Sequence, residues 1–328
     1  MTDVLRIGTL GAARITPMAL LRPALQVPAA AVTAVAARDA QRAAKYAAKH
    51  GIAKVHSSYE AMLADPDIDA IYNPLPNSHH ASWTIKALQA GKHVLCEKPL
   101  AANATEAQSM ADAAVAAGRV LMEAFHWRYH PLAARMKEIV DSGELGKVRH
   151  VETHFCIPLW IPGDIRYRLD LAGGATMDTG CYAISILRFL AGAEPEVLRA
   201  EARLSSPGVD RWMAADMRFA DGRTGRFSCS LFSAAVLRMQ ARVVGDSGEM
   251  TVFNPVAPHF YHHIKVVTPS ASRRERVRGE ATYVHQLRAF VDTVRNGTPV
   301  PTDPAHAIAN MRVIDEVYRK AGLQPRGA

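Results

Sequence analysis

The stretch LRIGTLGAARITPMALL, residues 5–21, runs from an apolar strand through a turn of small residues into a helix. Gly11, Ala13 and Thr16 stand in the spacing of the G-x-G-x-x-G/A pattern, in which only the first position keeps its glycine. Small residues let the backbone turn tightly and approach a pyrophosphate, whose charge the amides of a helix N-terminus hold. A tight turn without a ligand would use the same letters, but the position after the first strand favours a dinucleotide site. The predicted cofactor contacts here are Gly8, Gly11, Ala13, Arg14 and Ile15.

The first 125 residues alternate short apolar runs with helical stretches. This alternation is typical of a parallel sheet whose strands are joined by crossover helices. Right-handed crossovers between six strands produce an α/β, doubly wound sheet of the Rossmann type. The expected strands are residues 4–10, 31–37, 54–56, 70–73, 93–96 and 120–125.

The pattern changes from Lys147 onward, where strands follow one another too closely to be parallel, and Asp221-Gly222 is a strong hairpin signal between two of them. We therefore expect a dinucleotide-binding domain at 1–125 and, at 126–328, an α+β domain with an open-faced, mostly antiparallel sheet. Helices at 176–190, 282–295 and 304–320 are expected to cover one face of that sheet. The other face, left open with apolar residues, is a natural surface for a homodimer.

Length and composition set the class of protein. A chain of 328 residues with 49% hydrophobic and 21% charged residues fits a globular protein of two domains. The first residues lead directly into a strand without a targeting signal, and no apolar run is long enough to span a bilayer, so we expect a cytoplasmic protein without a membrane partner. The four cysteines are far apart and form no CxxC pair, which indicates reduced, buried thiols and no metal site.

The net charge of +8 at pH 7 raises the question of nucleic acid. The basic residues are spread along the chain, and the densest cluster, residues 273–278, is interrupted by Glu275 and Val277. Such a cluster is typical of a solvated loop or strand face, so nucleic acid is not an expected partner. A basic balance also suits a small phosphorylated ligand.

The end of the second strand indicates which dinucleotide is bound. Sites for NAD usually place an acidic residue there to bond the ribose hydroxyls, whereas this sequence has Arg38, with Arg42 one helical turn later. Two guanidinium groups suit a 2′-phosphate, so the expected cofactor is NADP rather than NAD. Asp39 is interpreted as a helix cap, and Arg42 could equally be an ordinary surface residue.

Two further segments follow the fourth and fifth strands, YNPLPNSHH at 72–80 and CEKP at 96–99. In a doubly wound sheet, ligands bind outside the carboxyl ends of the strands, so both segments should lie along the same crevice as the glycine turn. Lys98 would then be near the nicotinamide, where a cation can bond a substrate hydroxyl or carbonyl. The alternative is a simple pair between Lys98 and Glu97.

The segment LAGGATMDTGCYAI, residues 171–184, places a glycine pair before a helix that carries Asp178 and Tyr182. Residues four apart share a helix face, so both side chains can point into one pocket. An unperturbed tyrosine has a pKa of ~10, and a nearby ammonium lowers it by favouring the phenolate. Lys98 and Tyr182 are therefore a workable pair for proton transfer while hydride moves between alcohol and nicotinamide. The alternative for Tyr182 is a packing aromatic with its hydroxyl at the rim.

These residues together resemble the Gfo/Idh/MocA oxidoreductase family. The similarity is carried by GTLGAARI, by PLPNSHHASWTIKALQAGKHVLCEKPLA and by the Gly-Gly segment leading to DTGCY, and it runs over nearly the whole chain. More narrowly, the sequence is similar to the branch with dimeric dihydrodiol dehydrogenase, NADP-dependent D-xylose dehydrogenase and glucose-fructose oxidoreductase. The resemblance implies a Rossmann domain followed by an open-faced sheet domain, with the cofactor bound between them.

The resemblance also implies roles for single residues. Lys98 falls on the lysine of the family's EKP motif, Tyr182 on a helix position that is histidine in many relatives, and Asp178 on the carboxylate of that motif. It also implies cofactor contacts at Arg38, Asn77 and His80. Pro76 and Glu97, which adjoin Asn77 and Lys98 in the sequence, are further predicted cofactor contacts. Departures from the family pattern are Asn73, His126 and Ala175.

The expected activity is that of an NADP(H)-dependent dehydrogenase or reductase acting on CH-OH groups. Its substrate would be a small polyhydroxylated molecule, namely a sugar, polyol or cyclic diol or ketone. Candidate substrate contacts are His126, Trp127 and Arg128, which could instead pack at the domain junction, and Arg166 and Tyr167. The alternative is a dinucleotide-binding sensor without catalysis, against which the presence of both Lys98 and Tyr182 argues.

Overall fold

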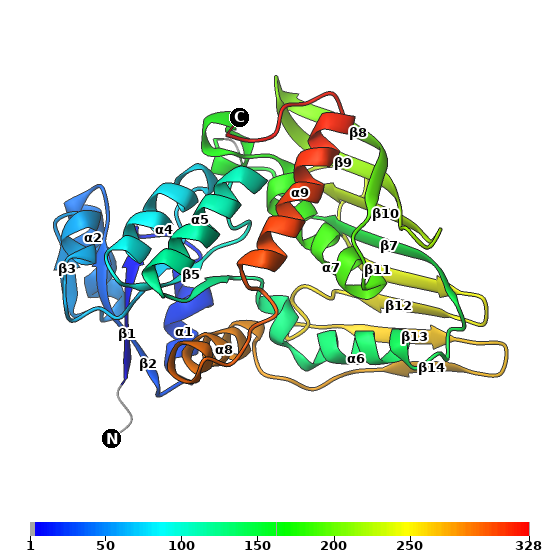
Figure 1. Cartoon of the computed structure of the whole chain (residues 1–328), viewed down its shortest axis with the longest axis horizontal. Coiled ribbons are helices and arrows are strands. Elements are labelled where there is room, and N and C mark those ends of the chain that lie inside the picture. Colours follow the sequence, from blue (N-terminus) through cyan, green and yellow to red (C-terminus); the bar gives the residue numbers. More distant parts are fainter. Residues whose placement is uncertain (1–3, 162, 328) are drawn as a thin grey trace. The chain divides into compact units, whose positions relative to one another are not determined.

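The computed structural model describes residues 4–161 and 163–327 and divides the chain into two compact units (Figure 1). The first unit comprises the chain up to Ala101, then Thr105–Arg128 and Tyr283–Ile308. The second comprises Ala102–Ala104, Tyr129–Thr282 and the chain from Ala309 onward. Within the described ranges, no helix has both the length and the apolar character that crossing a membrane requires.

The first unit contains the predicted doubly wound sheet. Its six strands pair in parallel in the order β3-β2-β1-β4-β5-β6. Strand β4 is fully buried and β5 nearly so, because helices cover both faces of such a sheet. The strands are β1 (Leu5–Leu10), β2 (Ala30–Ala36), β3 (Lys54–His56), β4 (Ala70–Asn73), β5 (His93–Cys96) and β6 (Leu121–Glu123).

One helix of the first unit was expected in the second domain. Helix α8 (Thr282–Asn296) was expected on the second sheet, but from Tyr283 it belongs to the first unit, where Arg295 donates to the carbonyl of Ala29 at 3.2 Å. An amphipathic pattern shows that a helix has a buried face but not which sheet it covers. The other helices are η1 (Pro17–Leu21), α1 (Arg22–Ala24), α2 (Ala40–His50), α3 (Tyr59–Leu63), η2 (Asn77–His79), α4 (His80–Gln89), α5 (Ala104–Ala117) and η3 (His126–Tyr129).

The second unit is built on a sheet of eight strands in the order β14-β13-β12-β11-β7-β10-β9-β8. Every pair is antiparallel except β7 with β10, so the prediction of a mostly antiparallel sheet is confirmed. The predicted hairpin turn at Asp221-Gly222 joins β9 to β10, and Gly222 has φ +85° there. The strands are β7 (Val148–Cys156), β8 (Glu196–Ser206), β9 (Val209–Arg218), β10 (Thr224–Ser230), β11 (Arg238–Gly245), β12 (Glu249–Phe253), β13 (His263–Val267) and β14 (Ser272–Glu275).

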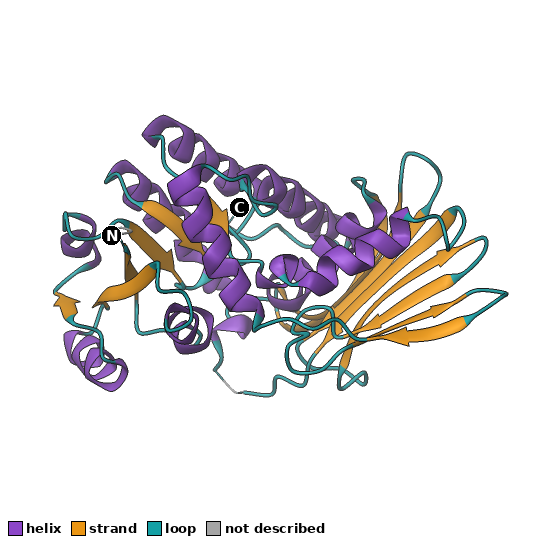
Figure 2. Cartoon of the chain, turned by 90° about the horizontal axis from the view of Figure 1, so that it is seen from below, coloured by secondary structure: helices purple, strands orange, loops and turns teal. Residues whose placement is uncertain are grey.

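Helices lie over one face of this sheet and leave the other face uncovered (Figure 2). Helix α7 packs on β7, β10 and β11, and Thr153 of β7 donates to the carbonyl of Ala183 in α7 at 2.9 Å. The helical segments of this unit are α6 (Pro131–Asp141), η4 (Ile165–Tyr167), η5 (Leu169–Leu171), η6 (Thr176–Gly180) and α7 (Cys181–Ala191). Helix α9 (Pro304–Lys320) begins in the first unit and continues in the second.

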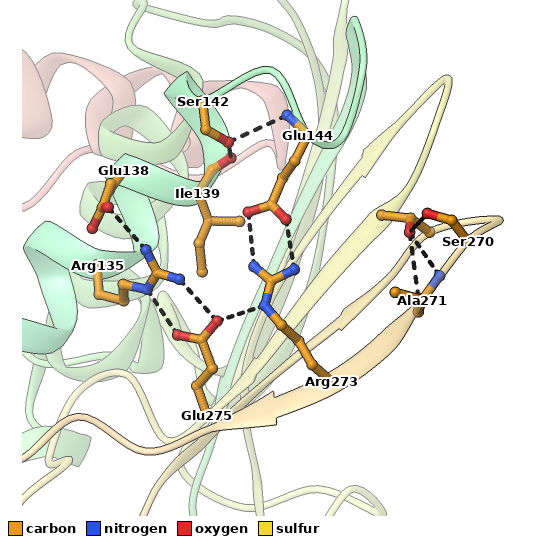
Figure 3. Close-up of polar contacts among 10 residues, drawn as sticks. Arg135, Glu138, Ile139, Ser142, Glu144, Ser270, Ala271, Arg273 and Glu275 are labelled. Carbon is orange, nitrogen blue, oxygen red and sulfur yellow. Dashed lines mark hydrogen bonds and ion pairs between the residues drawn. The ribbon is translucent and has the colours of Figure 1, made fainter.

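A chain of ion pairs attaches α6 to β14 (Figure 3). Arg135 donates to both carboxylate oxygens of Glu275, at 2.7 and 2.9 Å, and Arg273 donates to both oxygens of Glu144, at 2.6 and 2.8 Å. Arg273 also donates to Glu275 at 2.7 Å. Hydrogen bonds from Arg135 and then Arg273 lower the pKa of Glu275 to about 2. These contacts explain why the arginine-rich segment forms an additional strand.

The uncovered face of the sheet is charged at its centre. Side chains alternate between the two faces of a strand, so Glu152, next to the helix-facing Thr153, points away from the helices. The register places Arg226 and Arg242 on either side of Glu152 and Asp216 beyond Arg226. The expectation of an apolar open face is wrong for this row, because it depends on the register between strands, which no single strand shows.

Gly8 is needed for packing inside the first sheet rather than for a turn. It lies within β1, and a Cβ at this position would be 2.9 Å from Sδ of Met62 and 3.2 Å from Cδ1 of Ile68. Met62 is fully buried, so it has little room to move away. The strand and α3 therefore approach closely only because residue 8 has no side chain.

We expect Gly8→Ala to lower the free energy of unfolding by about 1–3 kcal/mol, since the added methyl group overpacks this contact. Urea unfolding of Gly8→Ala, Met62→Ala and the double variant tests the cause. The double variant should lose less stability than the sum of the two single losses. Additive losses would contradict the contact with Met62.

Candidate functional site

The glycine turn follows β1 at the carboxyl edge of the first sheet. Gly11 has φ +78°, and its N–H donates to the carbonyl of Ala36 in β2 at 2.6 Å. A Cβ at residue 11 would lie 3.2 Å from Leu75, in the loop that follows β4. Glycine is therefore required by both backbone conformation and space. Ala13 and Ile15 are half-buried after it, and Arg14 is exposed.

Basic side chains gather beside this turn. Asp39 caps α2 by accepting a hydrogen bond from the N–H of Arg42 at 3.0 Å, which confirms its interpretation as a cap. The Arg42 guanidinium donates to the carbonyl of Ala12 at 2.9 Å, and the Tyr46 hydroxyl donates to that of Ala13 at 3.3 Å. A cavity of ≈ 320 Å³ is lined by Ala12, Asp39, Gln41, Arg42, Lys45, Tyr46 and Lys49. Its three cations make it suited to an anionic group.

Asn73 holds the loop after β4. Its amide donates to the carbonyl of His80 at 3.2 Å and to the hydroxyl of Thr84 at 3.0 Å, while its oxygen accepts from the N–H of Leu75 at 3.3 Å. This residue departs from the family pattern, and its fully buried amide explains why a polar group is tolerated at the strand end. Pro76 and Asn77 are half-buried in the loop that it fixes.

His80 joins this loop to the EKP segment. Its Nδ1 lies 2.9 Å from the carbonyl oxygen of Pro99, and its Nε2 lies 2.7 Å from that of Leu75. Burial lowers the pKa of His80 to about 4, although both carbonyls oppose this by favouring the charged ring. The ring is therefore neutral at pH 7 and acts as a brace between the loops that follow β4 and β5. Contact with a cofactor stays a prediction for this residue.

The EKP segment is fixed by two buried carboxylates. Tyr72 donates to Glu97 at 2.6 Å, and burial followed by the charge of Glu97 raises the pKa of this tyrosine. Glu97 also accepts from the N–H of Lys98 at 3.3 Å, and Glu123 accepts from the N–H of Leu100 at 2.8 Å. The bond between Lys98 and the following proline is cis. The side chain of Lys98, only half-buried, follows a backbone that is held on both sides.

The residues after β6 are mostly interior. His126 and Trp127 are 4% and 1% exposed, and the ring of His126 lies 4.1 Å from that of Tyr283 in α8. Arg128 is half-buried. Residues 126–128 belong to the first unit, so the burial of His126 and Trp127 favours the alternative of packing over substrate contact.

In the second unit, the helix that carries Asp178 and Tyr182 does not begin as a regular α-helix. Residues Thr176–Gly180 form a π-helical turn, η6, before α7 begins. The sequence suggested one uninterrupted α-helix, so the face shared by Asp178 and Tyr182 was inferred from the wrong periodicity at its start. Insertions of this kind are frequent at functional sites. Gly180 allows the close packing here, since a Cβ would lie 3.0 Å from Sγ of Cys229.

Asp178 is paired with a predicted neighbour. Its Oδ2 lies 2.9 Å from Nε of Arg166, and Arg166 also bonds the buried Asp164 at 3.1 Å. The carboxylate of Asp178 is the main cause of a raised pKa of Arg166. Tyr182 is 5% exposed and stacks edge-to-face on Phe155, with ring centroids 5.5 Å apart. The structure thus brings together Asp178 and Arg166, both predicted as site residues.

Sequence reasoning missed the residues that hold the start of this helix. Asp210 accepts hydrogen bonds from the N–H and the hydroxyl of Thr176, both at 2.7 Å, and it pairs with Arg326 at 2.7 Å. Both charges are buried. No local signal identified them, because Asp210 looks like a turn residue and Arg326 stands between a proline and a glycine, outside any predicted helix or strand.

The depressed pKa of His80 makes stability depend on pH. In the unfolded chain, His80 has an ordinary pKa near 6.5 and is protonated below that pH, whereas in the folded chain it stays neutral down to about pH 4. The free energy of unfolding therefore falls as the pH decreases through this window. We expect His80→Gln to remove about 2 kcal/mol of the loss in unfolding free energy between pH 7 and pH 5. Urea unfolding at both values measures it, and an unchanged pH dependence would contradict the assignment.

Comparison with known proteins agrees with both units. Residues 5–125 match the model of the oxidoreductase family with an NAD-binding Rossmann fold, and residues 133–251 match the Gfo/Idh/MocA C-terminal domain. The chain is 36% identical to D-xylose 1-dehydrogenase (NADP(+)) 2 of Haloferax volcanii, with 96% of each covered. It is 40% identical to a dTDP-3,4-didehydro-2,6-dideoxy-alpha-D-glucose 3-reductase of Streptomyces antibioticus, with 89% of each covered.

Among solved structures, the chain is similar to KijD10, a 3-ketoreductase from Actinomadura kijaniata in complex with NADP and TDP-benzene. The TM-score is 0.91 at 28% identity, and 98% of each chain is covered. Together, the two family models cover most of the chain. The chain therefore belongs to the Gfo/Idh/MocA oxidoreductase family, as its EKP and DTGCY segments suggested.

Proposed function

We propose that the chain is an NADP(H)-dependent dehydrogenase or reductase acting on a sugar, a polyol or a cyclic diol or ketone. The observation that carries the proposal is the EKP segment, in which the buried Glu97 and Glu123 accept hydrogen bonds from the N–H groups of Lys98 and Leu100 at the carboxyl edge of the sheet. Relatives named as a xylose dehydrogenase and a sugar 3-ketoreductase support this substrate class.

The residues of the first unit fit NADP. Gly11 leaves space for a phosphate to approach the turn, and the cavity lined by Arg42, Lys45 and Lys49 beside it suits the 2′-phosphate. Arg38 lies exposed just past the end of β2 and would add a further guanidinium group. Gly8 stays a proposed contact, in addition to its packing against Met62.

Three side chains would share the chemistry. Bound nicotinamide accepts or supplies the hydride. Lys98 would donate a hydrogen bond to the reacting oxygen, and Tyr182 would take the proton from the alcohol or return it to the carbonyl. Asp178, held by Arg166, would orient a neighbouring hydroxyl of the substrate, and Arg166 and Tyr167 would be further substrate contacts.

We also propose a cytoplasmic homodimer formed through the open sheet face. The four cysteines are free and buried, which suits a reducing compartment. A row of alternating charges is self-complementary, because a second copy shifted by one strand sets Glu152 against Arg226. Charge rather than apolar area would therefore set the register of the dimer.

Replacing the proposed catalytic groups should separate binding from turnover. We expect Lys98→Ala and Tyr182→Phe to lower kcat by roughly 10²–10⁴-fold, because each removes a proton-transfer or oxygen-binding group, while the Kd for NADPH stays unchanged. NADPH oxidation with aldoses, ketoses, inososes and diketones measures kcat, and fluorescence titration measures binding. Lys320→Ala, which changes an exposed lysine at the end of α9, is the control. Full activity in Lys98→Ala would overturn the assigned role.

A charge reversal tests the dimer. Glu152→Lys places three like charges next to one another in the row, so sedimentation velocity should show a monomer where the unmodified chain sediments as a dimer. Asp112→Lys on the exposed surface of α5 is the matched control and should leave the sedimentation coefficient unchanged. A dimer that survives Glu152→Lys would contradict this interface.

A further inference from the structure

The carboxylate of Asp210 lies buried at the start of the helix that carries Asp178 and Tyr182. One of its oxygens accepts from the N–H and hydroxyl of Thr176, and the other accepts from the hydroxyl of Tyr318 at 3.0 Å. The helix has no side-chain cap of its own, since Ala175 precedes Thr176. Asp210 therefore supplies from β9 the anionic cap that a helix N-terminus favours.

Arg326 balances this buried charge and reaches the glycine pair at the same time. Its Nη2 donates to Asp210 at 2.7 Å, and its Nε donates to the carbonyl of Gly173 at 2.7 Å. The side chains of Arg326 and Asp210 are 1% and 0% exposed. A charge removed so completely from water requires a partner, so each residue holds the other in place.

The glycine pair leaves space for Asp210 and Arg326, and its backbone also bonds to Arg166 and Asp178. Gly174 has φ +133°, and a Cβ there would lie 2.2 Å from Oδ1 of Asp210, so any side chain would displace the carboxylate. The N–H of Gly174 donates to the carbonyl of Arg166 at 2.8 Å, and its carbonyl accepts from the N–H of Asp178 at 3.1 Å. One short segment thus connects the Asp210–Arg326 pair to both members of the Asp178–Arg166 pair.

We propose that Asp210 and Arg326 are positioning residues for the reaction, which fix the placement of Asp178 and Tyr182 through Thr176 and the glycine pair. The inference rests on the proposed function, because Asp178 and Tyr182 take part in chemistry only there. Neither positioning residue contacts substrate; they act through the first turn of the helix. Because a displacement on the order of 1 Å can cost 10²-fold in rate, a loosened turn should appear mainly in kcat.

Arg326→Lys tests the inference, since it keeps the charge but replaces the planar guanidinium, whose Nε and Nη2 bond Gly173 and Asp210, with a single nitrogen atom. We expect kcat to fall by roughly 10–100-fold with an unchanged Kd for NADPH. Arg326→Met, which removes the charge, should lower kcat further than Arg326→Lys. Arg273→Lys is the control, because that arginine bonds two carboxylates elsewhere in this unit, and its kcat should stay unchanged.

Amide hydrogen exchange gives a second readout that needs no turnover. In Arg326→Lys, the amides of residues 173–182 should exchange faster than in the unmodified chain, while those of β7 should not. Unchanged exchange in 173–182, or faster exchange with unchanged kcat, would overturn the inference. If the unmodified chain turned over no substrate at all, the proposed function would fail, and exchange alone would then decide whether this pair positions the helix.

Discussion

A parallel sheet brings the carboxyl ends of its strands to one edge, and the functional segments of the first unit depend on that constraint. The segments after β1, β4 and β5 leave adjacent strands, and the close approach of Leu75 to Gly11 shows two of them in contact. The segments after β4 and β5 contain backbone N–H groups that no longer bond to a neighbouring strand. Buried polar side chains take over these groups, namely Asn73 after β4 and Glu97 and Glu123 after β5.

In the second unit, a buried backbone N–H group is satisfied by a charged side chain. Asp210 satisfies the start of the helix, and Arg326 neutralises it. The carboxylate accepts four hydrogen bonds in total, one from the N–H of Thr176 and three from the side chains of Thr176, Tyr318 and Arg326. The burial of an ion pair is costly unless every acceptor is used, and here both oxygens are.

Local patterns in the sequence predicted most of the fold. The apolar run into Gly11 predicted the first strand and turn, and Asp221-Gly222 predicted a hairpin, because both depend on neighbouring residues alone. Helix α8 was assigned to the wrong sheet, since its apolar face fits either. The EKP and DTGCY segments were identifiable by resemblance, but their supports were not: Asp210 and Arg326 are 116 residues apart, and only the folded chain brings them together. No known pattern of residues identifies the π-helical turn in the sequence either.

The two edge strands of the second sheet affect how readily the chain can aggregate at high concentration. A strand at the margin presents unpaired N–H and C=O groups to which a foreign strand can add. Strand β14 has only four residues, and three of them are charged. Two of these, Arg273 and Glu275, belong to the chain of ion pairs that attaches α6. Strand β8 is longer, but its pairing with β9 is irregular at three points. Short length on one side and broken register on the other both disfavour amyloid-like growth from this sheet.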